Sequence, residues 1–351
     1  GQARRSAPRR SPLEHGNARV ARSRGDQTTK GDPQSDERHL HGYPVYLTNA
    51  SSNGTPNRGE KDMTQKRGLG WLPDVPKPND YHPYHPEIHR LLQKTKLGAQ
   101  LGASAIEAPM PAALPMSMDL RAGFSPIEDQ GPIGSCTANA AVGLLEYLER
   151  RAGGHFVDAS RLFLYKVERN LLGWTGDTGA YLRTAMEAMV LFGAPPERYW
   201  AYDVTQYDAE PTPFCYAFGQ NYKTLRYFRL DPDATSPQQI LSNIKLFVAH
   251  HFPVMFGFPV YSDYDNPLPG ALIPFPGPSS IYRGGHANVI AGYDDNKIIN
   301  GEKGALLVRN SWGTAWGDAG YGWLSYKYVS AGYADDFWTG IKLDWVNTGN
   351  F

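Results

Sequence analysis

The chain has two cysteines, and one of them, Cys136, stands where a reactive thiol would be expected. It follows a loop containing Gly131, Pro132 and Gly134, and it opens a stretch in which apolar residues recur at helical spacing. A cysteine in the first turn of a helix lies beside unpaired N–H groups and the positive end of the helix dipole, and both favour the thiolate. The plainer alternative is a small buried hydrophobic residue, as an isolated cysteine often is.

A thiolate nucleophile needs a general base, and the base needs a group that orients its ring. His286 opens an apolar, strand-like run, and Asn310 ends another over residues 304–309. If these strands are neighbours, the Asn310 amide can fix the His286 ring. The indole of Trp312 can then shield their hydrogen bond from water. The sequence thus predicts a Cys-His-Asn site.

The motifs resemble the papain family of cysteine peptidases, in its bacterial-type branch with an N-terminal proregion. The motifs are Gln130, Gly134-Ser135-Cys136, the strand-initial His286 and Asn310-Ser311-Trp312-Gly313. His286 follows Cys136 by 150 residues and Asn310 follows His286 by 24, which is the family's order and close to its spacing. The resemblance extends from Pro115 to the end of the chain.

Helical patterns come first along the chain and strand patterns later, which is typical of an α+β fold. After the Cys136 helix, the expected helices are residues 159–172, 181–192 and one opening at Ser236-Pro237, and the expected strands are residues 254–260, 286–293, 305–311 and 321–328. The resemblance implies a papain-like two-lobe fold, with a helical lobe at about 120–228, an antiparallel β-barrel-like lobe at about 229–345 and the active-site cleft between them.

The resemblance also implies the activity: a cysteine endopeptidase that acts on polypeptides and is made as an autoinhibited zymogen. The Cys136 thiolate would attack the peptide carbonyl, and the Gln130 side chain with the Cys136 N–H would stabilise the oxyanion. His286 would protonate the leaving amine, and water would hydrolyse the thioester. No cofactor and no metal is needed. The residues implied to bind substrate are Gly179, Ala180, Tyr181, Gly284, Gly285 and Trp312, and the small ones among them predict an open pocket that tolerates apolar side chains.

Two positions depart from the pattern of plant and animal relatives. Ile133 stands where they have a cysteine, three residues before the nucleophile, and Thr137 stands where they have an aromatic residue directly after it. The disulfide of that corner is therefore absent. Cys215, in a predicted loop or strand start, is expected to be a free thiol.

The chain is neutral overall, with 35 basic and 35 acidic residues, but its N-terminus is basic: the first 24 residues hold seven arginines and one acidic residue. Residues 1–66 are expected to be a disordered extension. Such an arm can bind nucleic acid or an anionic surface, or can simply be a solvated leader. Residues 67–115, with the Gly70-Trp71-Leu72-Pro73 element, are predicted to be a proregion and linker that packs on the catalytic domain, residues 116–351, as its intramolecular inhibitor.

Several alternatives remain open at this level. The same site can serve a transpeptidase or amidase that works through a thioester, or the chain can be a catalytically silent protein that holds peptides. His82, His85 and His89 hint at a metal, but two of them lie in a proline-broken loop and no further ligand completes a site. No run of 18 apolar residues predicts a membrane span. A monomer that is secreted or extracytoplasmic is favoured over a cytoplasmic one.

Overall fold

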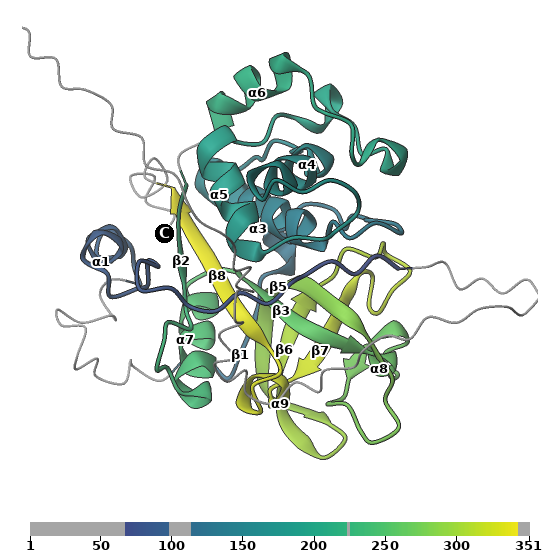
Figure 1. The fold of residues 1–351 in the computed structure, drawn as a ribbon. Helices are drawn as coiled ribbons and strands as arrows, with labels where there is room; N and C mark the ends of the chain where they lie inside the picture. The colour runs from purple at the N-terminus through teal and green to yellow at the C-terminus, as the bar shows by residue number, and fades with distance from the viewer. Residues whose placement is uncertain (1–66, 98–113, 223–224, 343–351) are drawn as a thin grey trace, which may run out of the picture. The chain divides into compact units, whose positions relative to one another are not determined.

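The computed structural model describes residues 67–97, 114–222 and 225–342, and every structural statement below concerns these residues. The first lobe is helical. Its main helices are α3 (Cys136–Gly153), α4 (Arg161–Leu171), α5 (Leu182–Phe192) and α6 (Pro213–Gly219), with short 3-10 turns at Arg121–Gly123, Glu197–Tyr199, Val204–Gln206 and Gln220–Tyr222. Figure 1 shows this lobe above the sheet. The prediction for residues 1–66 lies outside the described residues.

Local signals set the helix ends. The Ser160 hydroxyl accepts a hydrogen bond from the N–H of Phe163 and so caps α4, while α3 and α5 end at Gly154 and Gly193, both with positive φ. Fourteen residues of α3 are buried, so this helix forms the centre of the lobe and its first residue is held firmly. The predicted helices are confirmed to within about two residues at their ends.

The second lobe is built on a sheet. Its strands are β1 (Ser117–Asp119), β2 (Leu225–Arg229), β3 (Val254–Tyr261), β4 (Leu272–Ile273), β5 (Tyr282–Ile299), β6 (Glu302–Arg309), β7 (Tyr321–Ser325) and β8 (Asp335–Lys342). The order is β2-β8-β3-β5-β6-β7-β4, with β1 paired to β5, and all pairs are antiparallel except β4 with β7. Helices α7 (Pro237–Ala249), α8 (Ser262–Asp265) and α9 (Lys327–Ser330) connect the strands.

The α+β, two-lobe prediction is confirmed, but the sheet is not closed into a barrel. The two-residue strand β4 ends the sheet on one side and β2 ends it on the other, and no pairing joins them among the described residues. Two local predictions are also wrong. The strand expected over 321–328 stops at Ser325, whose hydroxyl accepts the N–H of Lys327 and starts α9. Cys215 lies in α6, which Pro213 opens at the first helical position.

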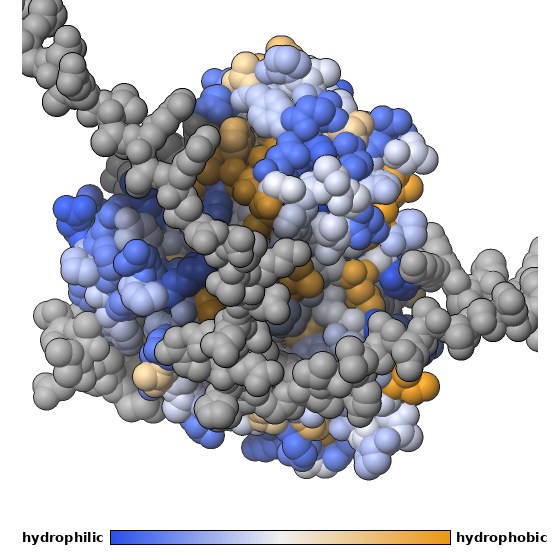
Figure 2. Space-filling model, viewed as in Figure 1, coloured by the Kyte–Doolittle hydropathy of each residue, from blue (hydrophilic) through white to orange (hydrophobic). Residues whose placement is uncertain are grey.

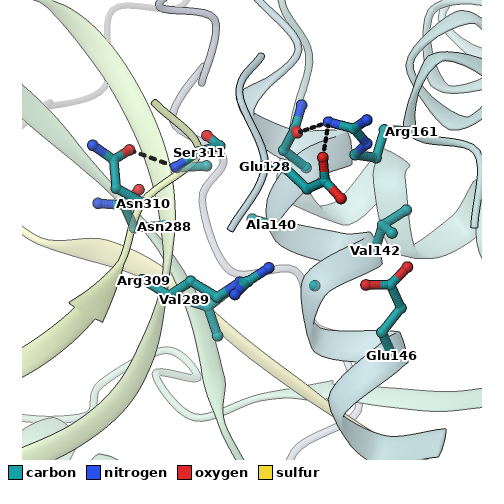
Figure 3. A pocket seen from close by; sticks show the side chains of 13 residues that line it. Glu128, Ala140, Val142, Glu146, Arg161, Asn288, Val289, Arg309, Asn310 and Ser311 are labelled. Carbon is teal, nitrogen blue, oxygen red and sulfur yellow. Dashed lines mark hydrogen bonds and ion pairs between the residues drawn. The ribbon is translucent and has the colours of Figure 1, made fainter. Parts of the chain in front are cut away.

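The two lobes meet along the inner face of α3. Arg309 at the end of β6 crosses to the helical lobe, where its Nη1 donates to the Ser125 carbonyl at 2.9 Å and its Nε lies where a side chain on Gly143 would stand. Figure 3 shows this seam, with Glu146 on α3 facing Arg309 across a cavity of about 10 Å³. That volume is about one water molecule. The two lobes are therefore closely packed against each other at this seam.

Residues 67–97 lie against both lobes. The segment 67–74, called the cleft segment below, runs between the helical lobe and the sheet as the dark blue trace in Figure 1, and α1 (Pro86–Leu92) follows it. The Arg183 guanidinium on α5 forms ion pairs with Asp74, the last residue of the cleft segment, and with Asp80 beyond it. Figure 2 shows a surface that is mostly polar or weakly hydrophobic, with orange confined to small patches. No helix of the described part of the chain is long and apolar enough to cross a membrane.

Candidate active site

Cys136 is the first residue of α3, as the sequence predicts, and it is fully buried. Its sulfur lies beside three backbone N–H groups, those of Thr137, of Ala287 on β5 and of Gly70 in the cleft segment. The thiol therefore contacts the helical lobe, the sheet and the cleft segment. Burial outweighs these donors and raises the pKa of Cys136 to about 12, so the thiol stays protonated while the cleft segment is in place.

His286 lies on β5, opposite Phe258 of β3, and is fully buried. Its Nε2 is 2.8 Å from the Oδ1 atom of Asn310, and its ring lies 4.9 Å from the Trp312 ring. Its other ring nitrogen, Nδ1, has no hydrogen-bond partner among the described residues. Burial lowers the pKa of His286 to about 4. With the cleft segment in place, cysteine and histidine are thus both neutral.

Asn310 directly follows β6 and keeps its amide in one orientation. Its Oδ1 accepts the N–H of Ser311 at 2.8 Å in addition to facing His286. A ring nitrogen that faces a carbonyl oxygen carries the proton, so Asn310 selects the His286 tautomer in which Nδ1 is free to accept one. Trp312 is 1% exposed and covers the pair, which excludes water from this hydrogen bond.

Gln130 is fully buried at the end of the loop that leads to α3, and its amide is completely bonded. The Oε1 atom accepts from the Ser311 hydroxyl at 2.6 Å. The Nε2 atom donates to two carbonyl oxygens, that of Ile133 at 2.9 Å and that of Gly68 at 3.1 Å. One N–H of this side chain therefore points into the cleft, where a carbonyl oxygen of the cleft segment now accepts it.

The cleft segment is hydrogen-bonded to both walls. On the helical side, the Gly70 carbonyl accepts the N–H of Ala180, and the N–H of Leu72 donates to the Ala180 carbonyl, at 2.9 and 3.1 Å. On the sheet side, the N–H of Trp71 donates to the Gly285 carbonyl at 3.2 Å. These bonds make a parallel bridge between Trp71 and Ala180.

Most of the residues expected to bind substrate contact this segment. Besides Ala180 and Gly285, Gly179 lies against the Gly70 carbonyl and Gly284 faces the side chain of Leu69. The Trp312 carbonyl accepts from the Arg67 guanidinium at 3.0 Å. The ring of Tyr181 instead pairs with that of Trp174, with ring centres 5.7 Å apart. That the six residues named in the sequence analysis bind substrate stays a prediction.

Three residues that the sequence analysis did not single out also belong to this region. Gly257 and Asp336 contact the indole of Trp71 from β3 and β8. Glu168 on α4 is fully buried, and the Thr137 hydroxyl donates to it at 2.8 Å. A glycine inside an apolar strand pattern, as at Gly257, is a recognised sign of a close approach. The sequence offers no comparable signal for Asp336 or Glu168.

Glu168 occupies the space beside the residue that follows the nucleophile. Its Oε2 has no hydrogen-bond partner among the described residues, and burial raises its pKa well above that of an ordinary glutamate. A protonated carboxyl here places no negative charge near Cys136. In the described part of the chain, no group of three or more His, Cys, Asp or Glu side chains is arranged to hold a metal ion.

The chain matches known proteins over this whole region. The model of papain family cysteine proteases matches residues 114–339. An uncharacterized peptidase C1-like protein of Acanthamoeba polyphaga mimivirus is 32% identical over 217 residues, which are 60% of this chain and 68% of that protein. Chymopapain of Carica papaya is 26% identical over 210 residues, so the match spans only about half, 54%, of that protein's length.

Among solved structures, xylellain, a cysteine protease from Xylella fastidiosa, is similar with a TM-score of 0.60 and 30% identity. The match covers 79% of this chain and 97% of xylellain. Since the family model alone covers more than half of the chain, and the two-lobe fold carries the cysteine and histidine on facing elements, the chain belongs to the papain family of cysteine proteases.

Proposed function

We propose that the protein is an endopeptidase that cleaves peptide bonds with Cys136 as nucleophile and His286 as general base and acid. The observation that carries this proposal is the 2.8 Å contact between His286 Nε2 and Asn310 Oδ1. This contact leaves the other ring nitrogen, Nδ1, free to accept a proton. The Cys136 sulfur lies beside the N–H of Ala287, the residue after His286 on β5, so the thiol is near the histidine. Endopeptidase action is supported by the course of the cleft segment, which shows that extended chain can continue past the thiol on both sides.

The reaction begins when His286 Nδ1 takes the proton of the Cys136 thiol. The thiolate attacks the carbonyl carbon of a peptide bond, and the new oxyanion accepts from Gln130 Nε2 and from the N–H of Cys136. The imidazolium then protonates the leaving amine as the C–N bond breaks, and a thioester remains. Water attacks the thioester, His286 takes one of its protons, and the carboxylic acid leaves as the thiol is restored.

We also propose that the cleft segment keeps the enzyme inactive as a zymogen. Of the cleft segment, the group beside the Cys136 sulfur is the Gly70 N–H, which is a hydrogen-bond donor and not a carbonyl carbon that a thiolate could attack. The Gly68 carbonyl, in turn, accepts a hydrogen bond from Gln130 Nε2, the donor that the oxyanion would need. The covered pair is neutral as well, so the ion pair of the working enzyme forms only after water reaches it.

Labelling with an irreversible epoxide inhibitor of cysteine peptidases tests both proposals. An open variant, the full chain with Gly68→Ala and Gly70→Ala, is compared with the unaltered chain, because an added Cβ would stand 1.8 Å from the Ile133 oxygen and 1.9 Å from the Gly134 oxygen. We expect mass mapping to locate the label on Cys136, at pH 7, at least about 100-fold faster in the open variant. Equal labelling of Cys215, or no labelling of Cys136 in either chain, would favour a silent peptide-binding protein.

The pH dependence of labelling gives a second reading of the same experiment. The thiolate is the reactive form, so the rate rises with pH until the thiol is fully ionised. In the unaltered chain the pKa of Cys136 is about 12, and the rate should still be rising at pH 10. In the open variant the rise should occur near neutral pH. Adding a free amine to the peptide assay separates hydrolysis from amide transfer, since a hydrolase gives mainly the free acid and a transferase mainly the amine-linked product.

Gln130→Ala in the open variant should lower kcat by about 100- to 1,000-fold, as loss of one oxyanion donor does in other acyl-transfer enzymes. KM should change little, because the donor acts mainly in the transition state. The matched control is Ser311→Ala, which keeps the Gln130 amide and removes only the hydroxyl that donates to Gln130 Oε1. A loss as large for Ser311→Ala as for Gln130→Ala would show that Gln130 acts only through loop structure.

A further inference from the structure

The side chain of Trp71 occupies a pocket that the main-chain contacts of the cleft segment do not require. The indole is 5% exposed and lies over Gly257 of β3, where an added Cβ would stand 1.8 Å from the ring atom Cε2. On the neighbouring strand β5, an added Cβ on Gly285 would stand 3.0 Å from the ring atom Cε3. Two glycines on paired strands therefore make room for one large flat side chain.

The floor of this pocket is a carboxylate. Asp336 of β8 is fully buried, and its Oδ2 accepts the indole N–H of Trp71 at 3.1 Å. Its Oδ1 accepts the indole N–H of Trp338, on the same strand, at 2.5 Å. One oxygen thus has a permanent donor. Among the residues that the structure describes, Trp71 is the donor to the other oxygen.

The backbone around Asp336 holds this acceptor in place at a cost. Asp336 has a φ of +62°, a conformation that a non-glycine residue adopts only when its surroundings demand it. Its N–H donates to the Asp231 carboxylate at 3.0 Å, and the Phe337 N–H donates to the other oxygen of Asp231 at 3.2 Å. Asp231 in turn is paired with Arg229 at 2.9 Å. A strained, fully supported acceptor at the end of a pocket is the arrangement expected of a recognition site.

The charges around the pocket favour a neutral guest over a cationic one. Arg229 lies 3.9 Å from Asp336 and both Arg229 and Arg183 lie 5.0 Å from the ring of Trp338. The acidic neighbours are Asp231 and Asp335. Since a guanidinium already faces the floor carboxylate, a lysine or arginine guest would meet positive charge, whereas an indole brings a donor without a charge.

We infer that this pocket, with Asp336 as its acceptor and Gly257 as its open wall, selects tryptophan in a polypeptide substrate, and that Trp71 fills it only until the cleft segment leaves. The inference rests on the proposed peptidase function and extends it to substrate class. Phenylalanine fills the same space but brings no donor, so it leaves a buried carboxylate oxygen unpaired. Leaving a buried acceptor without its hydrogen bond corresponds to about a 10- to 100-fold difference in affinity.

The first test is a positional-scanning library of fluorogenic tetrapeptides cleaved by the open variant. We expect tryptophan to exceed phenylalanine by at least about 10-fold in kcat/KM at one position of the tetrapeptide. Asp336→Asn should remove this ratio and spare the phenylalanine substrate, because asparagine tolerates the positive φ but turns one acceptor into a donor. The matched control Asp335→Asn should keep the ratio. A preference for leucine or valine, with tryptophan excluded, would overturn the inference.

The second test needs no catalysis. A synthetic peptide of residues 67–74 is titrated into the open variant, and its affinity is compared with that of a peptide carrying Trp71→Phe. We expect the phenylalanine peptide to bind at least about 10-fold more weakly, and the difference to vanish in the open variant with Asp336→Asn. Equal affinities would refute the pocket even if the enzyme is active. Unequal affinities in a chain that cleaves nothing would refute the proposed function and leave the pocket standing.

Discussion

Cys136→Ala in the open variant is expected to lower kcat/KM for peptide substrates by about 10⁴-fold or more, down to the background rate. The thiolate is the atom that forms the thioester, and nothing else in the site can replace it: Cys215, the other thiol, lies buried in α6 and contacts the Thr212 hydroxyl and the Tyr199 carbonyl. The measurement is the initial rate on a fluorogenic peptide. Thermal unfolding by circular dichroism shows that the variant is folded.

The matched control is Cys215→Ala, which removes the other thiol and should leave kcat/KM unchanged. A second comparison tests whether the residues act as one unit. His286→Ala should cost nearly as much as Cys136→Ala, and the double variant should be no slower than either, because groups that serve one step are strongly non-additive. Additive losses, or a Cys136→Ala chain that still turns over peptide above background, would contradict the proposed mechanism.

Much of the helical lobe and of the candidate site could be predicted because local sequence determines it. The start of α3 at Cys136 follows from the glycines and proline before it and from the helical spacing after it. His286 and Asn310 stand at the beginning and end of apolar runs that form neighbouring strands, so their contact follows from the strand pairing of β5 and β6. The prediction thus needs only short-range sequence signals and the antiparallel pairing of β5 with β6.

The remaining features depend on contacts between distant parts of the chain. Asp336 becomes an acceptor for Trp71 only through a contact between residues 265 positions apart, and its N–H donates to the carboxylates of Asp335 and of the distant Asp231. The open edge of the sheet depends on the very short β4, which no periodic pattern marks. For the same reason the sequence predicted a proregion at 67–115 but not the register in which Gly68 meets Gln130. Such features come from tertiary geometry, which composition and periodicity do not contain.

The open variant should hydrolyse peptides at least about 100-fold faster than the unaltered chain at the same pH. Main-chain bonds to Gly131, Ala180 and Gly285 hold the cleft segment, and so does the contact of Trp71 with Asp336. If the closed state is favoured over the open state by a free energy of about 3 kcal/mol, roughly one chain in 100 is open. The two added methyl groups cannot fit, since backbone oxygens lie 1.8 and 1.9 Å from their positions. Closure is therefore lost around Gly68 and Gly70, while neither substitution alters the ion pairs of Arg183 with Asp74, at the end of the segment, and with Asp80, beyond it.

The control for this prediction is Gly277→Ala, because an added Cβ there meets nothing within 4 Å and the residue lies far along the chain from the cleft segment. Its rate should equal that of the unaltered chain. The synthetic peptide of residues 67–74, added back, should inhibit the open variant by competition with substrate. If the open variant were no faster while its Cys136 labelled at the unaltered rate, the segment would not control access. The burial that holds Cys136 and His286 neutral would then have to come from the domain itself, and the zymogen proposal would fail.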